Sequence, residues 1–297
     1  MDYYNMYLAN AFTDRAFTGN ATGVIINSGK LQTDVMQNIA KDLNQDVTVF
    51  IKKLDFGLYS TRFFTRKREI NLCGHATIAT FYALAQHEYI QPIEEGTIKV
   101  IQYTGFGKVH VDIDYKNYKV ERVHMNLIAK EQERHLSIEE IIKALGIKKE
   151  DLGLNGAYME PKKISTGSAD IVIPVQSLEI LEKIKIDYEY MQEISIREDI
   201  ISFQVFTIIE NKDGVAKVRQ RTFSPSICVE EEAGSGTSTG ATLYYINRNI
   251  DPETNRLESV QGVEIGRKSC LLATLDNGNE VRVGGRAFVF MNGVLNI

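Results

Sequence analysis

Two short stretches of the chain carry the residue types that proton-transfer chemistry requires. One runs from Cys73 to His75, and the other runs from Glu232 to Thr237. An imidazole gives or takes a proton near neutral pH, and a carboxyl group beside an apolar helix has a raised pKa that suits a base. A thiol at a helix start ionises more readily than a free thiol. These residue types predict acid–base chemistry on a small molecule.

The two stretches belong to one repeated pattern. Residues 73–82 match residues 235–244 at a constant offset, with glycine, threonine and tyrosine at the same places. Further upstream, Arg-Phe-Phe-Thr at 62–65 matches Arg-Thr-Phe-Ser at 221–224. Two related half-chains are the economical explanation, and we therefore expect a duplicated fold.

Each copy is a polar, glycine-containing turn that leads into an apolar helix. A helix N-terminus presents unpaired N–H groups and a partial positive charge, which suit a carboxylate or an oxyanion. Gly74 and Gly236 have no side chain to keep a ligand away from these groups. We expect both glycines, together with Cys73, Ser235 and Thr237, to bind a small carboxylate held between the two turns.

Each of these residues also has a purely structural interpretation. His75 can satisfy neighbouring backbone groups, Cys73 can be a small buried hydrophobic residue, and the glutamates at 230–232 can be a solvated run. Ser235, the counterpart of Cys73, cannot act as a second thiol base. The residue types alone leave both interpretations open.

Several helix signals frame the two turns. Apolar residues spaced along 35–43 predict an amphipathic helix with Thr33 as its cap. Ser177 is placed to cap the equivalent helix of the second half. Residues 137–140 have the form of a capping box and open a helix that we expect to end near Gly146.

Strand signals surround the repeated helices. β-branched runs at 23–26 and 171–173 predict a strand in each half. The segments after Cys73 and Ser235 carry almost no charge, so each helix should be buried nearly all round. We therefore expect an α+β fold of two pseudo-symmetric domains, each a curved sheet or barrel wrapped around a central helix.

The domain boundary is expected near residue 128. The N-terminal half is 1–128 and the C-terminal half is 129–284. No stretch rich in proline, glycine or serine separates them, which indicates a tight crossover. The C-terminal strand, within 285–297, is expected to return to the first half.

Composition limits the classes of partner. The chain has 297 residues, 34 of them basic and 39 acidic, with a net charge of −5 and no long basic run, so nucleic acid is not expected. Cys73, Cys228 and Cys270 have neither disulfide nor metal-site spacing, which fits a reducing compartment. The segment after Met1 lacks signal-peptide features, and no apolar stretch approaches the ~20 residues of a membrane span. We expect a soluble, cytoplasmic protein without membrane contact.

Longer motifs resemble those of one known family. Residues 11–20 resemble its opening motif, in which a Gly-Asn pair precedes the first long strand, and we expect Asn20 of that pair to bind substrate. Residues 62–77 match its most distinctive stretch, with Cys-Gly-His-Ala-Thr at the end. Residues 223–238 resemble its motif Glu-Asp-Pro-x-Thr-Gly-Ser-Ala, and Gln-Gly, Gly-Arg and Gly-Gly pairs within 261–285 resemble its closing pattern. Over its whole length the chain resembles the PhzF family, the phenazine-biosynthesis-like isomerases of the diaminopimelate-epimerase fold.

The resemblance implies a mechanism and an assembly. It implies an active site in the cleft between two similar domains, usually in a homodimer, and chemistry without a metal or an organic cofactor. A carboxylate removes a proton from carbon, and the proton returns elsewhere on the substrate. By position, His75 corresponds to the family's active-site histidine, Glu232 to its second-half aspartate and Thr237 to its second-half serine. Gly74 and Gly236 match its substrate-holding glycines.

The family's catalytic glutamate has no counterpart in this chain. It lies in an Asn-x-Ser-Glu-Thr-x-Phe-Val stretch that corresponds to residues 44–51, where Val47 takes the place of the glutamate. Asp46 is the nearest replacement, but in an extended chain its side chain points away from that of Val47, so it serves only if the backbone turns. Glu232, one methylene longer than the family's aspartate, is expected to take part of the base role.

Three functions are compatible with this sequence. The one we favour is a cofactor-independent isomerase-like enzyme that acts on a small carboxylate other than the phenazine precursor, with Glu232, His75 and Asp46 moving the proton. The second is an epimerase or dehydratase of the same fold that uses Cys73 as its thiol. The third is a catalytically inactive small-anion-binding protein, an interpretation that Val47 supports.

Overall fold

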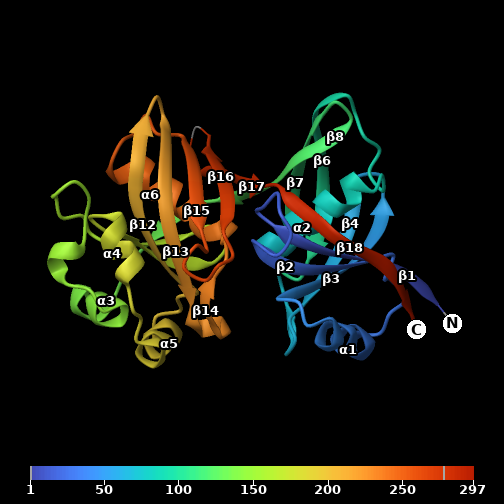
Figure 1. Ribbon diagram of the computed structural model, residues 1–297, viewed down its shortest axis with the longest axis horizontal. Coiled ribbons are helices and arrows are strands. Elements are labelled where there is room, and N and C mark those ends of the chain that lie inside the picture. The colour runs from blue at the N-terminus through green and yellow to red at the C-terminus, as the bar shows by residue number, and fades with distance from the viewer. Residues whose placement is uncertain (1, 277) are drawn as a thin grey trace. The chain divides into compact units, whose positions relative to one another are not determined.

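The chain folds into two compact units (Figure 1). The computed structural model describes residues 2–276 and 278–297. The first unit contains Met1–Asn126 and Gly284–Ile297, and the second contains Leu127–Val283. Each unit has its own sheet and its own central helix.

A curved mixed sheet makes up most of the first unit. Its strands follow the order β18–β1–β2–β3–β4–β6–β7–β8, and the short strand β5 pairs with β4. The pairs β2/β3 and β4/β6 are parallel, and the other pairs are antiparallel. The bounds are β1 Tyr3–Ala11, β2 Asn20–Ile26, β3 Val47–Asp55, β4 Leu58–Phe64, β5 Glu69–Ile70, β6 Glu95–Thr104, β7 Gly107–Lys116, β8 Lys119–Ile128 and β18 Ala287–Asn296.

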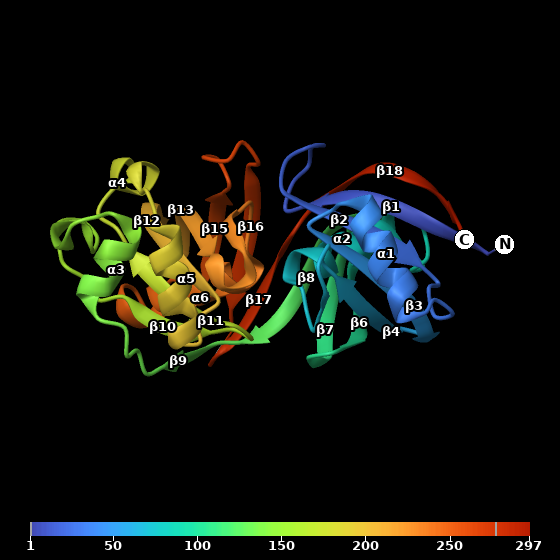
Figure 2. The ribbon, with the colours of Figure 1, turned by 90° about the horizontal axis from the view of Figure 1, so that it is seen from below.

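The two helices of the first unit lie in the crossovers that its parallel strand pairs require. α1, Thr33–Leu43, lies between β2 and β3 and buries Met36, Ile39 and Ala40. It packs against β3 and β4 and lies outside the strands (Figure 2). α2, Gly74–Gln86, lies between β4 and β6 and contacts β1, β2, β3, β7 and β18. The sheet therefore wraps around α2, which is buried on nearly all sides as the uncharged sequence predicts.

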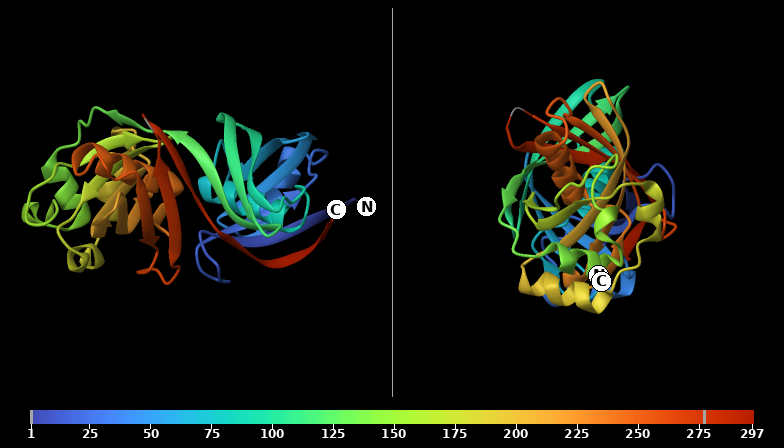
Figure 3. Two further views of the ribbon diagram at one scale, coloured as in Figure 1. Left: turned by 90° about the horizontal axis from the view of Figure 1, so that it is seen from above. Right: turned by 90° about the vertical axis from the view of Figure 1, so that its left-hand side faces the viewer.

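The last strand belongs to the first unit. β18 pairs with β1 in antiparallel register from Asn296 opposite Tyr3 to Ala287 opposite Ala11, as the two ribbons in Figure 3 show. Backbone hydrogen bonds of 2.8 and 3.1 Å between Asp2 and Ile297 extend the ladder. The last strand of the chain thus pairs with the first strand.

The second unit has a sheet with the same kinds of connection. Its strands follow the order β9–β10–β11–β12–β13–β15–β16, and β14 pairs with β13. The pairs β11/β12 and β13/β15 are parallel. The bounds are β9 Lys130–Gln132, β10 Lys162–Ser165, β11 Ala169–Pro174, β12 Ser202–Lys212, β13 Val215–Ser224, β14 Val229–Glu232, β15 Arg256–Gln261, β16 Ser269–Leu275 and β17 Glu280–Gly285.

One central helix and three outer helices complete the second unit. α6, Gly236–Asn249, contacts β10, β11, β12, β15 and β16, and most of its side chains are buried. The outer helices pack through a separate apolar cluster that includes Ile141, Leu181, Met191 and Phe203. Their bounds are α3 Ile138–Leu145, α4 Leu178–Lys183 and α5 Tyr188–Arg197, and 3-10 turns occupy η1 Lys149–Asp151 and η2 Pro225–Ile227.

The predicted helix caps can each be compared with the structure. Ser137 and Glu140 form the predicted capping box of α3, and Gly146 ends that helix in a left-handed conformation with φ 64°. Ser177 accepts a hydrogen bond from the backbone of α4, as predicted. The prediction for Thr33 is wrong, because the helix starts one residue earlier and Thr33 lies inside its first turn. The hydroxyl of Thr33 instead accepts a hydrogen bond of 3.0 Å from Arg62.

The two units repeat one order of elements. In each unit the first parallel pair, β2/β3 or β11/β12, is joined through outer helical structure. The second parallel pair, β4/β6 or β13/β15, is joined through the central helix. The predicted α+β fold of two pseudo-symmetric domains is confirmed. Within residues 2–276 and 278–297, no helix is both long and apolar enough to cross a membrane.

Candidate active site

The first turn of α2 has a backbone conformation set by Thr77. Cys73 is the N-cap residue, with an extended backbone (φ −143°, ψ 118°). The amide and the hydroxyl of Thr77 both donate to the carbonyl of Cys73, each at 3.0 Å. Gly74 and His75 are the first two residues of the helix, and a Cβ at Gly74 would lie 3.4 Å from Met125 Cε. A side chain at this position would therefore make only an ordinary van der Waals contact.

The first turn of α6 repeats this arrangement. Ser235 is the N-cap residue, again with an extended backbone (φ −116°, ψ 114°). Thr239 donates to the carbonyl of Ser235 through its amide at 3.0 Å and through its hydroxyl at 2.7 Å. Gly236 and Thr237 open the helix. The shared threonines of the repeat thus have one structural purpose, which is to fix the start of each central helix.

Neither N-cap side chain caps its helix. The thiol of Cys73 and the hydroxyl of Ser235 accept no capping hydrogen bond from the backbone of the first turn that follows. The first amide groups of a helix need partners from outside the helix, and a side-chain cap would ordinarily supply one. With no such cap, and with no acidic residue in either first turn, both helix starts suit an anionic group of a ligand.

A buried glutamine supports each helix start, and sequence reasoning missed both. Gln102 on β6 donates to the hydroxyl of Thr77 at 3.0 Å. Gln261 on β15 donates to the hydroxyl of Thr239 at 2.8 Å and accepts from the amide of Ser235 at 2.9 Å. These amides hold the threonine hydroxyls in place. A polar residue at an inward position of a strand was the only available signal.

His75 lies beside a thiol and close to a carboxylate. The Sγ atom of Cys73 lies 3.5 Å from both ring nitrogens of His75. Burial lowers the pKa of His75 to about 4, and the negative charge of Asp46 acts in the opposite direction. The half-buried ring is therefore neutral at pH 7, so it accepts a proton at one nitrogen and donates from the other.

Asp46 is held at the same end of the first unit. It precedes β3 directly, after α1 has ended at Asn44 in a left-handed conformation with φ 52°. Its Oδ2 atom accepts a hydrogen bond of 3.0 Å from the amide of Ala21. Asn20, the preceding residue, is buried at the first position of β2. The backbone turn that a role for Asp46 requires is therefore present, and its charge acts on His75.

Val47 faces the interior of the first unit. Its side chain is buried with Val49, Phe63 and Ala76, and Cys73 packs against this cluster. Ala76 and Cys73 belong to the start of α2. Val47, which takes the place of the family's catalytic glutamate in the resemblance, therefore lies in an apolar environment. This environment includes the first turn of α2, where His75 also lies.

The three glutamates before α6 have three different environments. Glu230 is exposed to solvent. Glu231 forms a two-point ion pair with Arg221, with distances of 3.1 and 2.7 Å. Glu232 accepts a hydrogen bond from the hydroxyl of Ser224. Among the three, Glu232 is partly buried and accepts from a serine hydroxyl, whereas Glu231 is paired with an arginine.

The upstream arginines of the repeat form matching ion pairs. Arg62 binds Glu69 through two contacts of 2.7 and 2.6 Å, just as Arg221 binds Glu231. Each pair connects the strand before the central helix to the segment that leads into the helix. The repeated Arg-Phe-Phe-Thr and Arg-Thr-Phe-Ser sequences thus have a structural role that sequence reasoning did not identify.

The second helix start also contains a group of hydroxyls and a buried acid. Ser235 Oγ lies 2.9 Å from Ser238 Oγ and 3.3 Å from Thr237 Oγ1. Asp170 on β11 has no exposed surface, and burial raises its pKa to about 8. Sequence reasoning missed Asp170, although a lone aspartate in the strand sequence Ala-Asp-Ile-Val-Ile-Pro was a usable signal.

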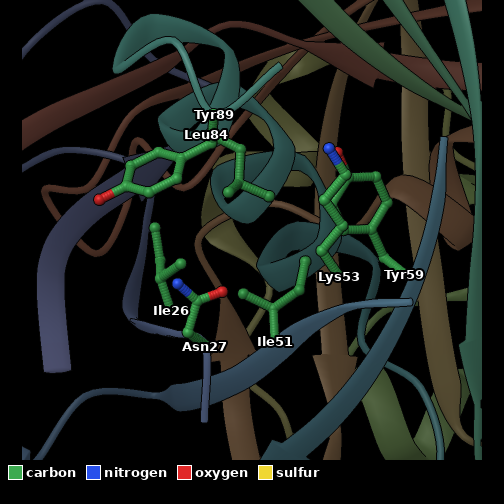
Figure 4. Close-up of a pocket in the computed structure, with 7 residues that line it drawn as sticks. All are labelled: Ile26, Asn27, Ile51, Lys53, Tyr59, Leu84 and Tyr89. Carbon is green, nitrogen blue, oxygen red and sulfur yellow. The ribbon is translucent and has the colours of Figure 1, made fainter. Parts of the chain in front are cut away.

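A small pocket of the first unit lies apart from these residues. Figure 4 shows it lined by Ile26, Asn27, Ile51, Lys53, Tyr59, Leu84 and Tyr89. Its volume of about 40 Å³ has room for little more than a water molecule. None of the candidate site residues lines it, so it is not a substrate site.

The described residues contain no group of three or more histidine, cysteine, aspartate or glutamate side chains arranged to hold a metal ion. The cysteines at 73, 228 and 270 form no disulfide bond. The chemical groups on hand at the two helix starts are therefore an imidazole, a thiol, carboxyl groups and hydroxyls.

A family model described as phenazine biosynthesis-like protein matches residues 9–293. The chain belongs to the PhzF family. An uncharacterized isomerase of Clostridium acetobutylicum is 30% identical over 302 residues, which cover 96% of each chain. The trans-2,3-dihydro-3-hydroxyanthranilate isomerase of Pseudomonas chlororaphis is 24% identical over 298 residues, which cover 98% of this chain and 99% of that enzyme. Because PhzF relatives of nearly full length are isomerases, this chain is an isomerase of the family.

The fold of a solved PhzF protein agrees. The crystal structure of the Bacillus anthracis PhzF-family protein covers 100% of both chains, with a TM-score of 0.82 and 22% sequence identity. At this level of identity the match concerns the fold. The PhzF assignment rests on the family model and on the Clostridium relative.

Proposed function

We propose that this PhzF-family isomerase moves a proton between two positions of a small carboxylate substrate, without a metal or an organic cofactor. One substrate is bound by the starts of both central helices, where Gly74, Gly236, Ser235 and Thr237 present backbone amides and hydroxyls to its carboxylate. Asn20 supplies a further polar contact. The observation that carries the proposal is that both helix starts have the same uncapped backbone while only their side chains differ.

The proton-moving groups are assigned from their environments. Glu232 is the base, because it is partly buried and its carboxylate accepts a hydrogen bond from a neutral hydroxyl. His75 is neutral at pH 7 and supplies or receives the second proton. Asp46 acts on His75 through its charge, which makes the imidazole a stronger base. The catalytic glutamate of the phenazine enzyme is replaced here by the buried aliphatic side chain of Val47. The natural substrate therefore differs from that of the Pseudomonas relative.

A thiol mechanism is the second candidate. It is favoured by the 3.5 Å contact between the thiol of Cys73 and the ring of His75, which can take the thiol proton. The equivalent residue of the second unit is Ser235, which lacks a second thiol. An epimerase or dehydratase with one thiol base is therefore the form that this alternative takes. The third candidate is an anion-binding protein without turnover.

Deuterium exchange separates these candidates. The protein is incubated in D₂O with a panel of small amino acids, hydroxy acids and cyclic carboxylates, and incorporation is followed by NMR. Trans-2,3-dihydro-3-hydroxyanthranilate belongs to the panel because a relative is named for it. The same panel is tested with His75→Ala, Glu232→Gln and Cys73→Ser.

The pattern of loss identifies the mechanism. Exchange that is lost in His75→Ala and Glu232→Gln and kept in Cys73→Ser supports the proposed function. Exchange abolished by Cys73→Ser supports the thiol mechanism instead. Binding of a carboxylate without exchange across the panel supports the inactive binding protein. Light scattering on the same samples tests the homodimer that the family resemblance implies.

A further inference from the structure

Asp170 is a buried acid that the proposed proton transfer does not use. It lies on β11, in an otherwise apolar strand, and has no exposed surface. Its cross-strand partners are Ser202 on β12 and Ile164 on β10, and Ser238 in the first turn of α6 is its third neighbour. Glu232 on β14 is the charged group that acts on it.

Hydroxyl groups link Asp170 to Glu232. Ser202 Oγ lies 2.8 Å from Ser224 Oγ, and Ser224 Oγ donates to Glu232 Oε1. The hydroxyls of Ser202 and Ser238 are the hydrogen-bond neighbours of the Asp170 carboxyl. Neither reaches its oxygens with full hydrogen-bond geometry within the part of the chain that the structure describes. Two carboxyl groups therefore lie at the two ends of a short path of two serines.

Counting hydrogens gives the direction of this path. Each serine hydroxyl has a single hydrogen to donate. Ser224 uses its hydrogen for Glu232, so its oxygen accepts the hydrogen of Ser202. Ser202 then has no hydrogen left and must accept one. An ionised carboxylate has none to give, so Asp170 completes the path only when it is protonated.

Burial of Asp170 and the charge of Glu232 agree with this count, whereas hydrogen bonding from Ser238 and Ser202 favours the ionised carboxylate and acts against it. Burial raises the pKa of Asp170 to about 8; hydrogen bonding to Ser238 lowers it, the charge of Glu232 raises it, and hydrogen bonding to Ser202 lowers it. Two neighbouring carboxyl groups do not readily ionise together. Burial and the charge of Glu232 therefore favour the protonated form of Asp170 at pH 7.

We propose that Asp170 is a positioning residue that holds one proton and, through Ser202 and Ser224, keeps Glu232 ionised and oriented as the base. This proposal rests on the proposed role of Glu232. Asp170 acts without touching the substrate. Because it lies on β11, which packs against α6, the site extends into the sheet behind that helix.

Two substitutions of Asp170 separate its role as a hydrogen-bond donor to Ser202 from its ability to lose a proton. In Asp170→Asn the amide still donates a hydrogen to Ser202 but does not titrate, whereas Asp170→Ala removes the donor. Losing a hydrogen bond that supports a charged group is expected to lower deuterium exchange about 10- to 100-fold in Asp170→Ala. Asp170→Asn is expected to stay within about threefold of the wild type at pH 7. Asp112→Asn, a buried aspartate on β7, is the matched control and leaves exchange unchanged.

The pH dependence of the exchange rate gives a further test, because it would not change if Asp170 served only in packing. Above a pH of about 8 the wild-type rate is expected to fall, because ionised Asp170 cannot donate to Ser202. Asp170→Asn keeps its rate in the same range, since its amide does not lose a proton. Ser202→Ala is expected to lower exchange as Asp170→Ala does, because it interrupts the path while leaving both carboxyl groups in place.

Infrared spectroscopy tests the proposal without any substrate. The ligand-free wild type is expected to show the carbonyl band of a protonated carboxylic acid at pH 7, and this band is absent in Asp170→Asn and present in Asp112→Asn. Glu232→Gln removes a negative charge that raises the pKa of Asp170, so the band should disappear at a lower pH in that variant.

The two sets of measurements fail in different ways. If no compound of the panel exchanges, the proposed function fails, and the infrared titration alone decides the pairing of Asp170 with Glu232. An absent band in the wild type, or a titration that Glu232→Gln does not shift, overturns the proposal. So does equal exchange in Asp170→Asn and Asp170→Ala, since a positioning donor must be rescued by the amide.

Discussion

At the start of α2 and at the start of α6, one threonine binds the carbonyl of the N-cap residue through both its amide and its hydroxyl. The side chains around these matching turns differ. The first turn has a thiol, an imidazole and the apolar cluster around Val47, and the second has hydroxyls and the carboxylate of Glu232. The two units thus share the backbone of these turns, while the chemical groups around the turns differ.

The strands behind the two turns show the same divergence. Arg62 lies opposite Phe50, and Arg221 lies opposite Val205, so Val47 and Ser202 occupy equivalent places three residues earlier on their strands. Their neighbours across the parallel pair are Thr22 and Asp170. One unit therefore has an apolar side chain where the other has a polar path to a buried acid. Equivalent places of the two units therefore differ in polarity, although the turns beside them share one backbone.

The largest expected effect comes from placing a carboxylate in the first unit at the position of Val47. Val47→Glu places an acid in the apolar cluster beside Ala76 and Cys73, where burial raises its pKa and makes it a stronger base. General bases contribute about 10²- to 10⁴-fold in rate, so conversion of trans-2,3-dihydro-3-hydroxyanthranilate should rise at least ~100-fold above the wild type. NMR assays of substrate loss check this result.

Val47→Gln is the matched control, with nearly the same shape and no base, and should give no gain. A folded Val47→Glu protein that remains as inactive as the glutamine variant would contradict the proposal that Val47 occupies the place of the family's catalytic glutamate.

The duplicated ion pairs should differ strongly in their contribution to stability. Both side chains of the Arg221–Glu231 pair are nearly buried, at 10% and 6% exposure, whereas those of Arg62–Glu69 are 34% and 39% exposed. Arg221→Met leaves a buried carboxylate unpaired and should lower the free energy of unfolding by about 3–5 kcal/mol. Arg62→Met should cost at most about 1 kcal/mol. Urea unfolding measures both.

A double variant that replaces Arg221 with Met and Glu231 with Leu removes both charges and should recover most of the loss. Equal losses for the two arginine variants would show that burial does not distinguish the two copies.

Asp170 should make the stability of the second unit depend on pH. Its folded-state pKa is raised from 3.8 to about 8, so the folded state binds more protons than the unfolded state between these values. Stability supplied by this group is present below a pH of about 4 and is lost as the pH rises toward 8. Asp170→Asn should therefore be more stable than the wild type at pH 7, by roughly 2–4 kcal/mol, and the gain should vanish near pH 4.

Thermal unfolding across this pH range tests the sign of the effect. The equivalent position of the first unit carries Thr22, so Thr22→Asn provides a control that should show no such pH dependence. A gain that persists at pH 4 would mean that Asp170 acts by packing alone.

The smallest effect concerns the N-cap side chains. Cys73 accepts no capping hydrogen bond, so Cys73→Ala should change the free energy of unfolding by at most about 0.5 kcal/mol. Ser235→Ala breaks the 2.9 Å contact with Ser238 and should cost about 1 kcal/mol. Ser137→Ala, which removes a true cap, should also cost about 1 kcal/mol. Denaturant titrations resolve these differences, and a larger loss at Cys73 than at Ser235 would reverse the assignment.

Local sequence signals were reliable where a few neighbouring residues decide the structure. Ser137 and Ser177 cap their helices as predicted, because a cap depends on contacts within one turn. The helix signal also located α1, but its first turn begins at Thr33, whose hydroxyl binds the distant Arg62. Thr33 therefore binds a distant arginine instead of capping the helix. The sequence of the helix gives no indication of this contact.

The candidate site was only partly predictable for the same reason. The repeat identified the turns at Gly74 and Gly236, since both turns are local and share a sequence. It did not identify Asp170 or the glutamines at 102 and 261, which lie far from the turns along the chain and meet them only across the sheet. The three adjacent glutamates looked alike in sequence, and only their strand partners distinguished Glu232 from Glu231.

The sequence by itself determined the duplicated α+β fold, the buried central helices and the family, because these depend on composition, periodicity and motifs along the chain. Tertiary structure decided the environment of each acid. Burial raises the pKa of Asp170 to about 8, and Glu232 accepts a hydrogen bond from Ser224 on the neighbouring strand. These effects act over a few ångströms in space between residues that are far apart in sequence, so they arise only when the strands have paired.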